Sequence, residues 1–292
     1  PWRRSVCPVR LLDARNSRTC FKPLSALALG EPAPRVHPEV CLGVLGVNEP
    51  PHWRLAEQGL VDDRARVDAA VGIDAVHFFE QIQKKYPTMR NFYSREKNEY
   101  VLEEDKDRRN YRWATVEGRR VCSGHVNPES VDEAFSQHEL VLDIVPYALS
   151  VSPLDCESLN VMFGFDYNYR GNHNSLLIEA LGITPAFEKL TDMAGSSVLC
   201  HEPSIQLALD ADCRTQCRLS VETRTSAYQI RTGEYPEDQI SVYLTARRYG
   251  SLEPGESYVE AMRRLTEVCR ELIDNYVIDH ILHPLQQTIA IK

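Results

Sequence analysis

The sequence lacks the features that mark several large classes of protein. No apolar run approaches the ~20 residues that a membrane-spanning helix needs. Positive charge is scarce, since 33 Lys and Arg residues stand against 42 Asp and Glu residues, for a net charge of −9. Gly-x-Gly-x-x-Gly loops, Walker loops and nucleophile elbows are also missing. We therefore expect no membrane span, no cofactor and, because polyanion binding needs a dense basic surface, no nucleic-acid partner.

The cysteines do not have the spacing of a disulfide framework. The nine lie scattered through the chain, and an odd, uneven set is typical of free thiols in a reducing compartment. One close pair, Cys213 and Cys217, would lie about 13 Å apart along a strand, which is too far to share a metal ion. The sequence therefore predicts no metal site and a cytoplasmic location.

The two ends of the chain differ in character. Residues 1–24 hold six basic residues and one acid, and prolines then interrupt any regular period up to residue 51. We expect residues 1–70 to form a poorly ordered or non-native leader. The alternative is a targeting segment, because the stretch is rich in Arg and poor in acids. Residues 71–292, with 23 basic and 34 acidic residues, are then predicted to form a single domain.

Several segments of this domain alternate as strands do. The clearest is 159–170, where every second residue is apolar or aromatic. Further strands are expected in a hairpin at 98–122 and at 204–210, 218–231 and 239–249. In the segment 204–210, Ile205, Leu207 and Leu209 are expected to face inward. The short connections favour antiparallel pairing, because parallel strands need a crossover.

Other segments repeat apolar residues at helical spacing. Helices are expected at 74–86, 130–146, 175–181 and 257–285. Ser130 with Glu133 and Ser257 with Glu260 match the capping box that opens a helix. The last apolar stripe must lie on another layer, and the sheet is the available one. The sequence therefore predicts an α+β fold in which an antiparallel sheet of about five to seven strands packs against a long C-terminal helix and shorter helices.

Several histidines suggest chemistry that their surroundings do not support. They are His173 in Gly171-Asn172-His173, the pair His280 and His283, His125 and His201 near cysteines, and His138 on an apolar helix face. A Gly-Asn-His tripeptide occurs in calcineurin-like metallophosphatases, but the upstream Asp-x-His and Gly-Asp-x-x-Asp segments of that two-metal site are missing. Turn and cap chemistry explains Asn172. Helix-dipole interactions explain His280 and His283, and packing at the core edge explains His138. The Cys–His neighbours at His125 and His201 match no known nucleophile–base signature, so no catalytic residue is assigned.

Charged residues alternate on the strand faces opposite the apolar ones. They are Asp166 and Arg170, Glu222 and Arg224, and Arg247. The simplest interpretation is a solvated polar face of an antiparallel sheet. The sharper interpretation is a concave groove or half-barrel in which these five side chains line a site for an anionic or polar ligand. Convergence of the five side chains would distinguish the groove from the solvated face.

The order of elements and three stretches carry a resemblance. The stretches are Phe163-Gly-Phe-Asp-Tyr-Asn-Tyr169, Ser241-Val-Tyr-Leu-Thr245 and the terminal helix with Ile-Asp-Asn-Tyr-Val-Ile-Asp-His-Ile-Leu. Over residues 70–292 the chain is loosely similar to a sporadically distributed group of bacterial proteins of unassigned function. The resemblance implies the fold, and it carries over no catalytic motif.

Two functional hypotheses follow. The first is a non-enzymatic binding or interaction module of the bacterial cytosol, whose polar sheet face holds a protein partner or a polar or anionic small molecule. The second is a hydrolase or phosphotransferase that acts on a phosphorylated small molecule in the same groove. The sequence alone does not decide whether the protein is an enzyme.

Overall fold

The computed structural model describes residues 37–47, 74–96 and 99–292. The chain divides into two units, Pro1–Ala33 and Pro34–Lys292. All described residues belong to the second unit, and the first unit lies outside them.

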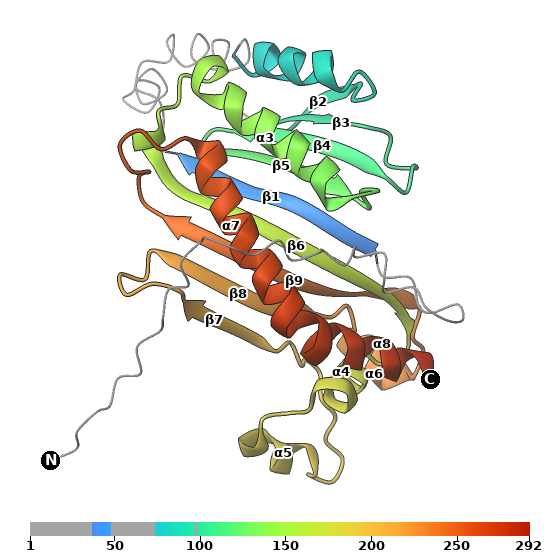
Figure 1. The fold of residues 1–292 in the computed structure, drawn as a ribbon. Helices are drawn as coiled ribbons and strands as arrows, with labels where there is room; N and C mark the ends of the chain where they lie inside the picture. Colours follow the sequence, from blue (N-terminus) through green and yellow to red (C-terminus); the bar gives the residue numbers. More distant parts are fainter. Residues whose placement is uncertain (1–36, 48–73, 97–98) are drawn as a thin grey trace, which may run out of the picture. The chain divides into compact units, whose positions relative to one another are not determined.

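One antiparallel sheet forms the framework of the second unit. Its nine described strands follow the order β2-β3-β4-β5-β1-β6-β9-β8-β7 (Figure 1). They are β1 (His37–Val47), β2 (Asn91–Glu96), β3 (Glu99–Glu103), β4 (Tyr111–Glu117), β5 (Arg120–Val126), β6 (Cys156–Arg170), β7 (Ser204–Ala208), β8 (Thr215–Glu222) and β9 (Glu237–Tyr249). The predicted α+β class and antiparallel pairing are confirmed, with more strands than the about five to seven expected.

Strand β1 lies in the middle of this sheet, between β5 and β6. It pairs antiparallel with both neighbours, and its ladder with β5 shifts register between Leu42 and Leu45. Gly43 and Gly46 interrupt its alternation, because glycine adds no side chain to the pattern. This strand falls inside 1–70, the range predicted as a leader, whereas the rest of that range lies outside the described residues.

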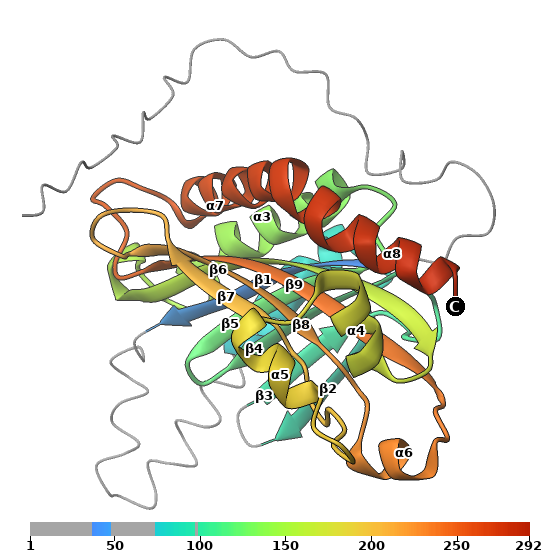
Figure 2. The same ribbon diagram turned by 90° about the horizontal axis from the view of Figure 1, so that it is seen from below.

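The described helices lie around the sheet, and only some of them share one face of it. They are helix 74–85, α3 (Val131–Ala148), α4 (His173–Leu181), α5 (Pro185–Thr191), α6 (Ala227–Thr232), α7 (Tyr258–Leu272) and α8 (His283–Ala290). In the two ribbon views α3, α7 and α8 lie on the same side of the strands (Figures 1 and 2). Helix α3 packs on β5 and β1, and α7 packs on β6, β9 and α3. Helix 74–85 reaches the far strand, where the rings of Phe79 and Phe92 are 5.5 Å apart.

The core lies between these helices and the central strands. On β6 the alternate residues are each at most 2% exposed, namely Leu159, Val161, Phe163, Phe165 and Tyr167. Helix α7 contributes Ala261, Leu265 and Cys269, all buried. The apolar face predicted for 159–170 is therefore confirmed.

The C-terminal helix is longer and less regular than its sequence period indicates. Ser257 and Glu260 form the predicted capping box. Between α7 and α8 the backbone widens into a π-helix, Ile273–Leu282. The buried hydroxyl of Tyr167 donates a hydrogen bond to the Leu282 carbonyl (3.2 Å) at the end of this segment. Pro284 follows and cannot donate to an upstream carbonyl, so the helix is locally distorted where these two features meet.

Two predicted strand segments differ from the structure. Ile205, Leu207 and Leu209, expected to face inward, are 54%, 48% and 40% exposed, because no described helix covers the sheet at β7. The segment predicted as a strand at 218–231 ends as β8 at Glu222 and continues into α6. A capping box between Ser226 and Gln229 starts that helix, and the turn chemistry overrides the strand pattern.

Candidate functional site

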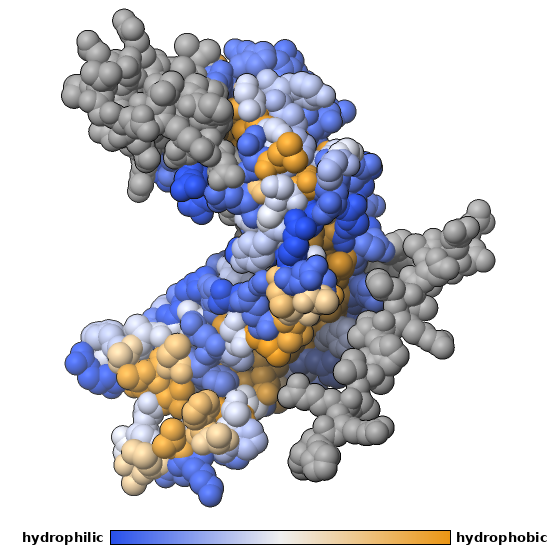
Figure 3. Space-filling view, turned by 90° about the vertical axis from the view of Figure 1, so that its left-hand side faces the viewer, coloured by the Kyte–Doolittle hydropathy of each residue, from blue (hydrophilic) through white to orange (hydrophobic). Residues whose placement is uncertain are grey.

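The face of the sheet opposite α3 and α7 is polar and hollowed. Figure 3, which views the molecule from the left of Figure 1, shows the hollow on the side away from these helices. Side chains alternate along a strand, so every second residue of each strand lies on this open face. On β6 and β8 these are the even-numbered residues, and on β9, which lies between them, they are the odd-numbered ones. Asp166 on β6 is opposite Ser241 on β9, and Ser241 is opposite Glu222 on β8. These three residues form a row across three strands.

Arg224 completes this row from the loop after β8. One of its guanidinium nitrogens, Nη2, donates to Ser241 Oγ at 3.5 Å. The other, Nη1, lies 3.6 Å from Glu222 Oε2. We call Asp166, Glu222, Arg224 and Ser241 the Ser241 cluster.

Asp166 is the member of the cluster with unused hydrogen-bonding capacity. Its Oδ1 atom is buried and has no hydrogen-bond partner within residues 74–96 and 99–292, the ranges whose side chains the structure describes. A buried acceptor without a donor costs free energy, typically about 1–3 kcal/mol. The geometry therefore favours a bound molecule that supplies an N–H or O–H group at this position.

The loop that carries Arg224 is fixed by the Gly-Asn-His segment. Asn172 caps α4 by accepting from the amides of Asn174 (3.0 Å) and Ser175 (3.3 Å), as the turn-and-cap interpretation predicts. The Arg224 amide donates to His173 Nδ1 at 3.2 Å. Burial lowers the pKa of His173, which keeps Nδ1 available as an acceptor. His173 thus positions the loop that carries Arg224.

The remaining two predicted site residues lie apart from the cluster. Arg170 is at the end of β6, opposite Glu237. Arg247 is six residues from Ser241 along β9, about 20 Å at the usual strand rise. Its Nε donates to the Asn160 side chain, and its guanidinium lies over the Tyr249 ring at 5.5 Å. The structure therefore brings together three of the five charges predicted to line a site.

Ser241 was not among the residues selected from the sequence. Its signal was weak because serine on a strand is common and carries no charge. The strand parity of 239–249 places it on the polar face, but only the register with β6 and β8 shows that it lies between two carboxylates. Register is not readable from a single strand.

The other histidines have structural partners. His138 and Ser123 are fully buried, and Ser123 Oγ is 2.7 Å from His138 Nδ1 under α3. His283 Nδ1 lies 3.3 Å from Asp279 Oδ1 on the exposed side of the C-terminal helix. No group of three His, Cys, Asp or Glu side chains able to hold a metal ion occurs among the described residues.

His125 belongs to a buried polar network at the β4–β5 end of the sheet. Its Nε2 donates to Asn110 Oδ1 at 2.7 Å. Burial, followed by the charge of Arg112, lowers the pKa of His125 to about 4. Arg112 in turn contacts Glu104 and Glu133, so its charge is compensated. Through Arg112 and Glu133, this network connects β4 to the start of α3 and stabilises the fold.

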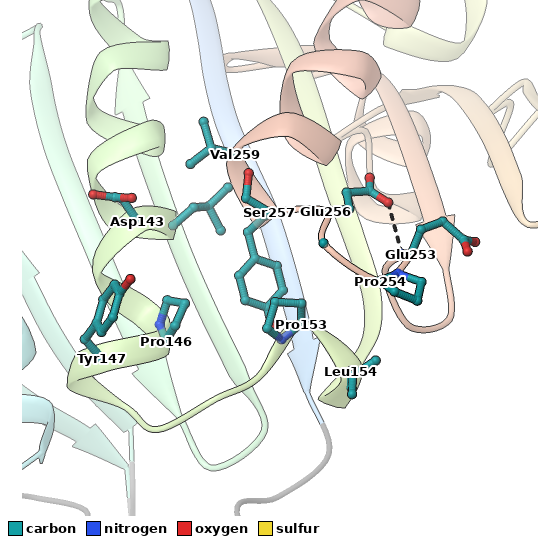
Figure 4. Close-up of a pocket in the computed structure, with 13 residues that line it drawn as sticks. Asp143, Pro146, Tyr147, Pro153, Leu154, Glu253, Pro254, Glu256, Ser257 and Val259 are labelled. Carbon is teal, nitrogen blue, oxygen red and sulfur yellow. Dashed lines mark hydrogen bonds between the residues drawn. The ribbon is translucent and has the colours of Figure 1, made fainter.

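A cavity of about 650 Å³ opens between α3, the 3-10 helix Pro153–Asp155 and the start of α7 (Figure 4). Prolines and apolar side chains from three segments line it, and sequence reasoning did not find it because these segments are distant in sequence. Its polar groups mostly serve the fold. Tyr258 Oη donates to the Ser152 carbonyl at 2.6 Å, and Glu256 accepts from the Glu253 amide at 3.1 Å.

Comparisons with known proteins add no relative. Neither a protein-family model, nor a curated protein sequence, nor a solved structure matches the chain. Within the described ranges, none of the helices combines the length and apolar character needed to cross a membrane. The functional assignment therefore rests on the site itself.

Proposed function

We propose that the protein is a non-enzymatic binding module whose hollowed sheet face holds a polar ligand at the Ser241 cluster. The observation that carries this proposal is the buried Oδ1 of Asp166, which lacks a donor among the side chains of residues 74–96 and 99–292. Two carboxylates and one guanidinium surround Ser241. Such a balance favours a ligand with amine, amide or hydroxyl donors over a phosphate.

The alternative of a hydrolase or phosphotransferase is less well supported. A phosphorylated substrate needs several converging cations, whereas Arg170 and Arg247 lie away from Arg224. The one close Ser–His contact that the described residues offer, Ser123 with His138, is buried and inaccessible. Both points favour the binding module.

We further propose a bacterial cytoplasmic location. Six cysteines are free thiols, and four of them are buried; the six are Cys122, Cys156, Cys200, Cys213, Cys217 and Cys269. This fits a reducing compartment, where structural disulfides are rare.

A ligand screen with matched variants tests the proposal. A thermal-shift panel of amines, amides, polyols and phosphate esters identifies a ligand, and calorimetric titration measures its Kd. We expect Asp166→Ala, which removes the buried acceptor, to weaken a donor-bearing ligand about tenfold or more, the value of one charge-assisted hydrogen bond.

Arg247→Ala serves as the matched control, since this arginine lies outside the cluster. It should leave the Kd within about twofold. Selective binding of phosphate esters that survives Asp166→Ala but is lost in Arg247→Ala would contradict the proposal and favour the enzyme alternative.

A further inference from the structure

Strand β7 ends the sheet with an unpaired edge. The Leu209 amide donates to the Thr215 carbonyl (2.8 Å), and the Pro203 carbonyl accepts from the Val221 amide (3.0 Å). Since both backbone groups of a residue in an antiparallel ladder point to the same neighbour, odd-numbered residues face β8. Ser204, Gln206 and Ala208 therefore direct their amide and carbonyl groups outward, where no described strand pairs with them.

The side chains of this edge are unusually apolar for an exposed strand. Ile205, Leu207 and Leu209 share one face and are 40–54% exposed. Natural edge strands are normally protected by charge, proline or a covering element. The five residues of β7 include no charge and no proline.

Apolar exposure is concentrated around β7. Of the 15 large apolar side chains exposed among the described residues, seven lie between Phe187 and Leu209. Figure 3 shows apolar surface gathered in the lower part of the molecule, where Figure 1 places β7 and α5. Such a concentration marks an interaction surface, because single exposed apolar residues are normally scattered.

The charge of the residues around β7 indicates what kind of partner would bind there. Residues 185–213 contain one lysine and five acids: Glu188, Asp192, Glu202, Asp210 and Asp212. Arg214 follows, and Arg218 of β8 donates to Ser204 Oγ at 3.2 Å, so the charge around β7 stays negative but is partly offset. Antiparallel pairing of β7 with a second copy, centred on Leu207, would place Glu202 opposite Asp212 in both directions. Like charges opposite each other are destabilising, so a second copy fits poorly in this register, whereas a cationic strand is complementary.

We propose that β7 is a docking edge for an extended cationic peptide segment of a partner protein. The segment adds a tenth strand to the described sheet, with hydrogen bonds to the outward amides and carbonyls of Ser204, Gln206 and Ala208. Alternate apolar side chains of the segment pack beside Ile205 and Leu207, and its Lys or Arg residues face the acids around the strand. This surface is separate from the Ser241 cluster, so either proposal can stand without the other.

The experiment uses the full chain and a fluorescein-labelled peptide of about seven residues with alternating valine and lysine. Fluorescence anisotropy measures its Kd, beside a peptide with glutamate in place of lysine. We expect binding of the lysine peptide only, weakening as salt is raised. Sedimentation velocity of the chain alone reports self-association.

Two variants remove different parts of the edge. Gln206→Pro removes an outward amide without breaking the ladder to β8, and Leu207→Lys removes apolar contact and adds a charge like that of the peptide. Each should weaken peptide binding about tenfold or more. Ile291→Lys, at the 78% exposed C-cap of α8, is the control and should change Kd less than about twofold. Circular dichroism melts confirm that each variant is folded.

Three outcomes would overturn the inference. They are no binding of the lysine peptide at about 1 mM, equal binding of the glutamate peptide, and retained affinity in both edge variants. A dimer of the unmodified chain that Gln206→Pro abolishes would overturn it as well, in favour of a second copy as the occupant.

Discussion

The two ends of the sheet both carry apolar side chains but bury them differently. At the β2–β3 end, helix 74–85 lies over the strands, and Phe78 and Leu102 are fully buried. At the β7 end, Ile205, Leu207 and Leu209 share one face of the strand and remain 40–54% exposed. The difference is a covering layer, which the first end receives from helix 74–85 and which no described helix supplies to the second.

The two ends show that the face on which a side chain lies and the burial of that face are separate properties of a strand. Alternation specifies which side chains share a face of the sheet. Burial depends on whether another segment of the chain, often distant in sequence, packs on that face. The covered end should therefore hold much of the stability, and the uncovered end should be available for binding.

The largest expected effect is in the covered end. Phe78→Ala should lower the free energy of unfolding by about 3–5 kcal/mol, because it removes a fully buried ring and leaves a cavity. Urea denaturation followed by circular dichroism measures the change. Phe92→Ala is the matched control, because Phe92 on β2 is 45% exposed. This substitution should lower the free energy of unfolding by only about 1 kcal/mol. Equal losses in the two variants would show that helix 74–85 does not cover this end.

Acid should weaken the same end through His125. The folded-state pKa of about 4 lies below the ordinary histidine value of 6.5, so the unfolded chain binds more protons between these values. The stability contributed by neutral His125 is thus fully present above about pH 6.5 and is lost as the pH falls toward 4, up to about 3 kcal/mol.

The variant His125→Gln isolates this contribution. It keeps a donor for Asn110 and cannot titrate, so its urea-unfolding profile should be flatter from pH 6.5 to 4 than that of the unmodified chain. A profile parallel to the unmodified one would show that other groups cause the acid sensitivity.

Local signals in the sequence were sufficient for much of the fold. The capping box at Ser257 and Glu260 predicted where the last helix begins, and the strict alternation of 159–170 predicted the buried face of β6. The π-helix was not predicted, and one of the two features that meet at its end, the Tyr167 hydrogen bond to the Leu282 carbonyl, comes from the sheet and has no local signal. Strand β1 was missed because glycines weaken its pattern, and its two neighbours follow much later in the chain.

The candidate site was predictable in composition but not in assembly. Strand parity placed Asp166, Glu222 and Arg247 on the polar face. The register between the strands decides which of these side chains come together. It places Asp166 and Glu222 on either side of Ser241 and leaves Arg247 six residues from Ser241 along β9. Arg224 joins the cluster because its loop is held by His173, a tertiary contact with no local signal.

The smallest expected effect is at the uncovered end, and it is the sharpest test of the comparison. Leu207→Ala should lower the free energy of unfolding by less than about 1 kcal/mol, because the side chain is already 48% exposed and no large cavity forms. Leu102→Ala, on the covered end, provides the matched reference and should cost about 2–5 kcal/mol. If Leu207→Ala instead cost as much as Leu102→Ala in urea denaturation, another part of the protein would have to cover β7, and the proposed peptide edge would be closed.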